Sequence, residues 1–225
     1  LSHAGKGKSH GWFFFTCYNS EQANTLLEVN ASQNDKDFIM AVNWKKAEEY
    51  IKAGKGKIEK TKYAHNTWND ETHTGTSVIK DEVLVLDAMA MKDICYLMPC
   101  PKSPHGCDVD PTGEYIVGSG KLAALIPVFS FDKMVKAIGK KDYEGDYEGI
   151  PVLKYNSVLH GEVQKPGLGP LHTEFDGRGN AYTTFFVSSE VVKWDIKTLK
   201  VLDRVPTYYS VGHLMIPGGD SKKPF

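Results

Sequence analysis

Two stretches of this chain share one pattern, His105-Gly-Cys-Asp-Val-Asp-Pro-Thr-Gly-Glu-Tyr115 and His172-Thr-Glu-Phe-Asp-Gly-Arg-Gly-Asn-Ala-Tyr182. In each, a histidine stands ten residues before a tyrosine in a predicted strand, and an Asp and a Gly that favour a turn lie between them. A third histidine, His213, begins another such unit 41 residues after His172. Units of several strands that repeat every ~40–50 residues are typical of propeller blades.

The remaining sequence has the same character. Several short segments are rich in β-branched and aromatic residues and are bounded by Gly, Pro, Asn or Asp, which predicts strands at 11–18, 38–42, 82–87, 114–117, 181–187, 191–194 and 201–205. Only residues 44–53 and 131–138 have a helical pattern, the second with Ser130 as its N-cap. The predicted fold class is therefore all-β, and the repeat favours a β-propeller.

The two longer repeats are 67 residues apart, so the propeller interpretation requires an insertion between them. The helix at 131–138 and the acidic, Gly-bearing stretch 140–149 supply it. That stretch and residues 54–81 contain few large aliphatic side chains, and we expect both to be loops on the outside of the propeller.

The composition excludes several function classes. The 225 residues include 27 Lys and Arg and 28 Asp and Glu, so no basic face for nucleic acid is expected. The longest apolar run, 122–129, is too short to span a bilayer. Neither end has the features of a natural terminus, and we expect the chain to be part of a longer protein. The four cysteines form no C-x-x-C pair, which favours four free thiols near strands, with one disulfide as the alternative.

Equivalent positions of successive blades lie at the same height around the propeller axis. Histidines at one position in three blades would therefore meet at one mouth of the central channel. Clustered neutral imidazoles suit copper, zinc, iron or nickel. The sequence thus predicts a metal site formed by His105, His172 and His213, whereas a structural role is expected for His3, His10, His65, His73 and His160.

Four runs of the sequence resemble nitrous oxide reductases: Gly11-Trp-Phe-Phe-Phe-Thr-Cys-Tyr-Asn-Ser-Glu21, Pro101-Lys-Ser-Pro-His-Gly-Cys107, Gly167-Leu-Gly-Pro-Leu-His-Thr-Glu-Phe-Asp-Gly-Arg-Gly-Asn-Ala-Tyr-Thr-Thr184 and Tyr209-Ser-Val-Gly-His-Leu214. The run Leu214-Met-Ile-Pro-Gly-Gly-Asp220 is more similar to the Sec-exported branch of that family. The resemblance implies a seven-bladed propeller, of which residues 1–225 cover only some blades. It also implies a C-terminal cupredoxin domain that is not present in this chain.

The resemblance further implies an activity, the reduction of nitrous oxide to dinitrogen and water as the last step of denitrification. Members of the family do this at a four-copper, sulfide-bridged cluster held by seven histidines, and His105, His172 and His213 stand where three of them stand. The other four ligands and the two-copper electron-entry site would lie outside this chain. The implied enzyme is a periplasmic homodimer whose electron donor is a c-type cytochrome or a cupredoxin.

Two further sets of residues follow from the resemblance. Tyr18 and Glu21 match side-chain ligands of a calcium site in the family, Asp35 matches a third, and Val29 falls where a backbone carbonyl contributes. Ser103 stands where better-known members have an Asn ligand. The outer nitrogens of the histidine rings are expected to bond to carboxylates or carbonyls, and the candidates are Asp108, Asp110, Glu174 and Asp176.

Two other function classes remain open at this point. One is a non-catalytic propeller that binds a protein partner and keeps its histidines without copper. The other is a hydrolase or lyase with a single calcium or other ion in the channel, which would need carboxylates or Asn where this chain has histidines. Copper content and colour distinguish the three.

Overall fold

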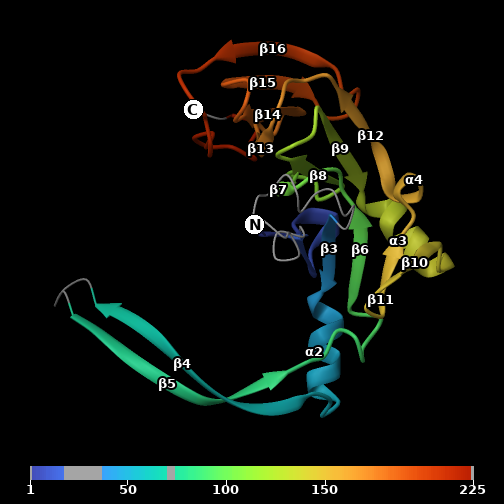
Figure 1. Ribbon diagram of the computed structural model, residues 1–225, viewed down its shortest axis with the longest axis vertical. Coiled ribbons are helices and arrows are strands. Elements are labelled where there is room, and N and C mark those ends of the chain that lie inside the picture. Colours follow the sequence, from blue (N-terminus) through green and yellow to red (C-terminus); the bar gives the residue numbers. More distant parts are fainter. Residues whose placement is uncertain (1, 18–36, 70–73, 224–225) are drawn as a thin grey trace, which may run out of the picture.

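The computed structural model describes residues 2–17, 37–69 and 74–223, and these form mainly short antiparallel strands (Figure 1). Three successive groups of four strands, here called blades I, II and III, follow one another along the chain. Blade I contains β1 (Ser2–Ala4), β2 (Trp12–Cys17), β3 (Phe38–Asn43) and β6 (Cys95–Pro99). Blade II contains β7 (Pro104–Val109), β8 (Tyr115–Gly120), β9 (Leu125–Ser130) and β12 (Leu159–Gln164). Blade III contains β13 (Pro170–Phe175), β14 (Asn180–Phe185), β15 (Glu190–Asp195) and β16 (Val201–Pro206).

Each blade is an antiparallel meander with its strands in chain order. The first strands are neighbours in space, since β7 contacts both β1 and β13. In Figure 1, β7 and β13 lie on one side of the molecule, and β12 lies on the other. This arrangement confirms the predicted all-β propeller fold and identifies β1, β7 and β13 as the inner strands.

Insertions between the third and fourth strands distinguish the blades. Blade I carries α2 (Trp44–Lys52), β4 (Lys57–Asn69) and β5 (Thr74–Val85), whereas blade II carries α3 (Phe131–Lys140), β10 (Tyr143–Tyr147), β11 (Ile150–Leu153) and α4 (Tyr155–Val158). The insertion of blade II accounts for the long spacing between the two repeats, as predicted. Its strand β11 pairs in parallel with β6, so it extends the sheet of blade I.

Both predicted helices are present, and they begin in the same way. Asn43 and Ser130, the last residues of β3 and β9, each accept a hydrogen bond from the backbone N–H three residues later, at 3.0 and 3.2 Å. Such a side-chain oxygen satisfies one of the free N–H groups of the first turn. Trp44 and Phe131 are then the first residue of each helix.

The loop predictions were wrong in two places. Residues 54–81 contain all of β4 and most of β5, which form a long antiparallel hairpin that reaches away from the blades (Figure 1). The stretch 140–149 includes β10, which is largely exposed, as expected, but pairs with β11. Both errors have one cause: cross-strand hydrogen bonds hold a polar hairpin together without a run of large aliphatic residues.

Two apolar clusters lie between the blades. Blades I and II share buried residues that include Phe14, Ile39, Ile116 and Phe129, with Met134 of α3. Blades II and III share a second set, Val117, Ile126, Val128, Val163, Phe175, Ala181, Phe185, Val192, Trp194 and Ile196. Sheet-on-sheet burial of this kind is the main stabilising contribution in such a fold.

All four cysteines are free, as favoured by the sequence. In the described part of the chain, no helix is both long and apolar enough to cross a membrane.

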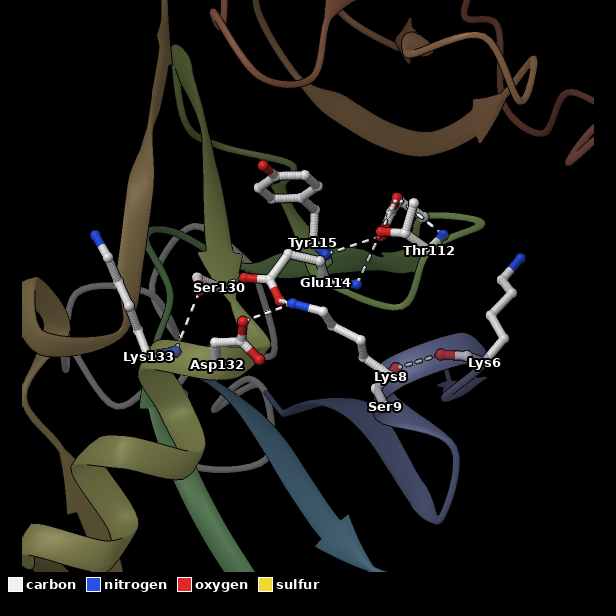
Figure 2. A network of polar contacts seen from close by, with 10 residues as sticks. Lys6, Lys8, Ser9, Thr112, Glu114, Tyr115, Ser130, Asp132 and Lys133 are labelled. Carbon is white, nitrogen blue, oxygen red and sulfur yellow. Dashed lines mark hydrogen bonds and ion pairs between the residues drawn. The ribbon is translucent and has the colours of Figure 1, made fainter. Parts of the chain in front are cut away.

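The turns of blades I and II also interlock, at the end of β7 opposite His105. The ammonium group of Lys8 contacts Glu114 at 3.1 Å and Asp132 at 2.6 Å, and Glu114 in turn accepts from the Ser130 hydroxyl at 2.6 Å (Figure 2). Lys8 is half-exposed, so these ion pairs contribute little stability and mainly select one arrangement of the turns. The backbone of the turn fits as closely, because a Cβ on Gly113 would lie 1.7 Å from the carbonyl oxygen of Lys6.

A buried polar chain crosses blade III. The hydroxyls of Thr173 and Thr183 are 2.7 Å apart, and the indole N–H of Trp194 donates to the Thr183 Oγ1 at 2.9 Å. All three side chains are almost completely inaccessible to solvent. A donor left unpaired in such a position loses its hydration without compensation.

We therefore predict that Thr183→Val, which keeps the shape of the side chain, lowers the free energy of unfolding by about 1–3 kcal/mol, because the Trp194 N–H loses its acceptor. Chemical denaturation monitored by tryptophan fluorescence measures this change. Thr183→Ser, which keeps the hydroxyl, is the control and should be less destabilised; equal losses in the two variants would contradict the role of the hydroxyl.

Candidate metal centre

The three predicted histidines lie together. His105 is in β7, His172 is in β13, and His213 lies in the segment after β16. The ring centroids of His105 and His172 are 5.1 Å apart in an edge-to-face arrangement, and those of His172 and His213 are 4.0 Å apart and nearly parallel. The structure thus brings together three side chains, the outermost of which are 108 residues apart in the sequence.

The local backbone explains how the rings are aimed. The pairing of β7 with β8 shifts between Pro104 and Gly106, and that of β13 with β14 shifts between Pro170 and Thr173. Such irregularities redirect a side chain relative to the regular pleat. None of the strands predicted from the sequence includes these histidines, whereas His105 and His172 lie within inner strands at these irregular points.

Blades II and III approach most closely beside the histidines. A Cβ on Gly106 would lie 1.8 Å from the carbonyl oxygen of Leu171, so glycine is required next to His105 for the residue before His172 to come so near. Because the obstacle is backbone, a side chain at position 106 would push the inner strands apart.

The environment of His172 favours its neutral form. Burial lowers the pKa of His172 to about 4, and the neighbouring His213 and His105 rings act in the same direction, whereas Asp108 opposes the shift. Its Nε2 is buried and has no hydrogen-bond partner among the described residues. A neutral imidazole with an unshared lone pair is the form that binds a transition metal.

The sequence analysis named four carboxylates as candidates to bond to the outer nitrogens of the histidine rings, and two of them have other roles. Asp110 accepts from Thr112 and Tyr115, and Asp176 accepts from Arg178 and Asn180, so both close the turn between the first and second strands. None of the four candidates is found hydrogen-bonded to a ring nitrogen of His172 or His213 in the described part of the chain.

The other two carboxylates lie nearer the channel. Asp108 accepts from the backbone N–H of Thr173 at 2.8 Å, beside His172. Burial raises the pKa of Glu174, and the carboxylate of Asp108 adds to this shift. Both side chains therefore belong to the surroundings of the histidines.

The donor set is nitrogen-rich. Burial raises the pKa of Cys107 well above its usual range, so this thiol stays protonated within the apolar cluster between blades I and II. Within residues 2–17, 37–69 and 74–223, no group of three or more His, Cys, Asp or Glu side chains is arranged to hold one metal ion. The three rings instead contact one another directly.

The remaining histidines have varied surroundings. His10 packs edge-on against Trp44, and His160 contacts the Tyr115 ring and the Lys197 carbonyl, both structural contacts as expected. His3, in contrast, lies on inner strand β1, and its Nδ1 accepts from the backbone of Val109 at 3.1 Å. His73 and the side chain of His65 lie outside the part that the structure describes.

The predicted calcium ligands Tyr18, Glu21, Val29 and Asp35 also lie outside the described residues. Asp37, which the sequence reasoning missed, is buried. Its Oδ2 accepts from the Ser103 N–H at 2.6 Å, and its Oδ1 is buried without a hydrogen-bond partner in the described ranges. A buried carboxylate oxygen is costly unless it is paired or binds a cation. Ser103 also has a left-handed backbone, with φ of 58°.

Comparison with known proteins adds a family relationship. The chain is 32% identical over 211 residues to a nitrous-oxide reductase of Stutzerimonas stutzeri, covering 88% of this chain and 28% of that protein. It is 34% identical over 181 residues to the enzyme of Pseudomonas fluorescens, covering 80% and 24%, and 38% identical over 125 residues to that of Ralstonia nicotianae, covering 51% and 18%. The chain spans about a quarter of the length of these relatives or less.

Two other comparisons are less informative. No family model matches the chain. Among solved structures, apo AztD from Citrobacter koseri aligns with a TM-score of 0.37 and 9% identity, over 78% of this chain and 46% of that one.

The lowered pKa of His172 predicts an acid-sensitive metal-free protein. The unfolded chain binds a proton at this position below about pH 6.5, whereas the folded chain does so only near pH 4. The contribution of His172 to the free energy of unfolding is therefore fully present above pH 6.5 and is lost as the pH falls to 4. This contribution is on the order of 3 kcal/mol. Denaturant titrations at several pH values on the wild type and His172→Gln measure it; the variant should show a shallower dependence, and parallel curves would contradict the assignment.

Proposed function

We propose that this chain, which is related to a segment of the nitrous-oxide reductases, contributes His105, His172 and His213 to a copper centre that reduces nitrous oxide. The observation that carries the proposal is the contact of these three rings, which come from three successive units of the fold. Their recurrence in the same repeat makes a chance meeting of three surface histidines a poor explanation.

The properties of the residues fit copper. The set consists of imidazoles, and His172 is partly buried, is neutral over the physiological pH range and has a buried Nε2 without a hydrogen-bond partner among the described residues. Soft-to-intermediate metals such as copper prefer such ligands, whereas calcium and magnesium prefer oxygen. Four further histidines, expected from the family, would complete the ligand set from parts of the protein beyond this chain.

The protein's own contribution to the reaction is to bind and to orient. The bound copper ions would supply two electrons to nitrous oxide, a poor ligand that a single metal ion activates weakly. The histidines would hold the copper ions through their ring nitrogens, and the close approach of the backbones at Gly106 and Leu171 restricts the separation of the two strands that carry His105 and His172. The partly buried position of His172 limits the access of water to its ring.

The proposal extends to the whole protein. We infer a periplasmic homodimer that takes part in denitrification, with a C-terminal cupredoxin domain whose two-copper site receives electrons from a c-type cytochrome or a cupredoxin. These features come from the relationship to nitrous-oxide reductases and not from any contact within residues 1–225.

A calcium site beside blade I is a second part of the proposal. Tyr18, Glu21 and Asp35 are its expected side-chain ligands, and we add Asp37 as a candidate in the same segment. The unpartnered Oδ1 of Asp37 supports this addition, since an oxygen ligand of a hard cation is expected to have a free lone pair.

The decisive experiment measures copper in the protein that contains this chain, purified without oxygen. We expect bound copper, a visible absorption spectrum and nitrous oxide reduction in the wild type. His172→Ala should weaken copper binding by more than about 100-fold, because loss of a direct ligand exceeds the effect of an outer-shell change. His10→Ala, which removes an exposed histidine, is the control and should keep its copper. A copper-free wild type would favour the non-catalytic propeller, and a fully loaded His172→Ala would remove His172 from the site.

The calcium proposal has its own test. Asp37→Asn should reduce calcium content and remove most of the difference in melting temperature between calcium-containing and chelator-containing buffers. Asp203→Asn, a change of an exposed carboxylate on β16, should leave that difference unchanged. If Asp37→Asn lowers the melting temperature equally in both buffers, Asp37 serves only its link to Ser103.

A further inference from the structure

One residue of each inner strand occupies an equivalent place just below the histidines. The equivalence follows from the backbone hydrogen bond that closes the turn after the inner strand of each blade: Gly5 N–H to Trp12, Asp110 N–H to Tyr115 and Asp176 N–H to Asn180, at 2.8, 3.0 and 3.2 Å. Two residues before each donor stand His3, Asp108 and Glu174. They come from β1, β7 and β13, and we call them the second hub layer.

Two members of this layer make the same kind of contact with the blade that follows. The Nδ1 of His3 in blade I accepts from the backbone N–H of Val109 in blade II, at 3.1 Å. The Oδ2 of Asp108 in blade II accepts from the backbone N–H of Thr173 in blade III, at 2.8 Å. Each side chain thus reaches across to an inner strand of a different sheet.

The alternative interpretation of His3 and Asp108 as an ion pair fits less well. Their closest atoms, Nδ1 and Oδ1, are 3.7 Å apart, and an ion pair there would require a proton on Nδ1. The contact with the Val109 N–H requires a lone pair at the same atom instead. The shorter contact therefore identifies His3 as an acceptor.

The contacts matter because the inner strands belong to separate sheets and do not pair with one another. Without such a link, only side-chain packing sets the height of one inner strand relative to the next. Thr173 directly follows His172, so the bond from Asp108 acts on the backbone that carries this ring. The same link holds the strands together where Gly106 and Leu171 approach.

We propose that His3 and Asp108 are positioning residues, each of which accepts a backbone N–H from the inner strand of the next blade and so sets the height of that blade's histidine. His3 acts on the strand of His105, and Asp108 on the strand of His172. Glu174 occupies the equivalent position in blade III, where its carboxylate accepts no hydrogen bond from the described residues. The role of these links in placing metal ligands rests on the proposed function, whereas the hydrogen bonds themselves do not.

The test compares an acceptor-keeping with an acceptor-free substitution, Asp108→Asn and Asp108→Leu, in the protein that contains this chain. Amide hydrogen exchange of the metal-free protein reports the link directly. Asp108→Leu should raise the exchange rate of the Thr173 amide about tenfold or more, and Asp108→Asn should leave it close to the wild type. Asp203→Leu, an exposed acid on β16, is the matched control and should change nothing near Thr173.

The same pair of variants tests the positioning role with copper bound. The visible and electron paramagnetic resonance spectra should change in Asp108→Leu and be restored in Asp108→Asn, an outcome that a general loss of stability does not produce. Should Asp108→Leu fail to fold, His3→Leu and the acceptor-keeping His3→Asn provide a second pair, with exchange measured at the Val109 amide.

The outcomes separate the two hypotheses. Unchanged exchange at Thr173 in Asp108→Leu, or equal increases in Leu and Asn variants, would overturn the link. A wild type without copper would overturn the proposed function and leave the exchange result to decide on the link alone. A changed exchange rate with an unaltered copper spectrum would keep the link and remove its positioning role.

Discussion

The inner strands β1, β7 and β13 converge without pairing with one another, and the rest of the described structure depends on this constraint. Strands within a sheet are held in register by their hydrogen-bond ladder, but strands of separate sheets have no such ladder. Everything that fixes their relative height must come from side chains, turns and close backbone contacts. His105 and His172 lie on two of these strands, so the distance between their rings depends on those contacts.

Three kinds of contact provide it, at different depths. Apolar clusters hold the sheets face to face, with Phe129 between blades I and II and Trp194 between blades II and III. Such burial is strong but tolerant of small sliding movements. The glycine contacts at Gly106 and Gly113 are less tolerant, because backbone meets backbone there. Polar links such as that of Asp108 to the Thr173 N–H have a direction and therefore select a single register.

The sequence predicted the features that repeat and missed those that depend on contacts between distant segments. The turn pattern around Asp110 and Asp176 was readable because each aspartate accepts its hydrogen bonds from residues at most six positions later in the sequence. The Ser130 cap was readable for the same reason. In contrast, aligning the repeats by their histidines displaces the turns by one residue, because the turn aspartate follows His105 by five residues and His172 by four. The irregular pairing of β7 and β13 beside these histidines has no local signature that a single sequence exposes.

Two of the residues missed at the site illustrate the same limit. His3 was assigned a structural role because a lone histidine near one end of a sequence carries no pattern, and its place on an inner strand follows only from the pairing of β1 with β2. Asp37 lacked a signal because its partner, Ser103, is 66 residues away. The hairpin of β4 and β5 was missed for a different reason, since its threonines and lysines are as common in loops as in exposed strands.

The insertions show how a repeat can vary without disturbing its centre. Those in the described part of the chain lie between the third and fourth strands, far along each sheet from the inner strand, so their length has no direct effect on the hub. The insertion of blade II nevertheless returns to blade I, where Val152 of β11 pairs with Leu97 of β6. Blades I and II are therefore joined at both ends: by the turn contacts and His3 near the axis, and by a shared sheet at the periphery. Among the described residues, blades II and III share no such peripheral strand, and His160 of β12 reaches the Lys197 carbonyl of blade III at 3.1 Å instead. The register between His105 and His172 therefore depends on side-chain contacts, on the Asp108 link and on the close backbone approach at Gly106, without a hydrogen-bond ladder between the two blades. A ladder fixes register more strictly than side-chain contacts do, and it is the junction without a ladder that separates the two histidines.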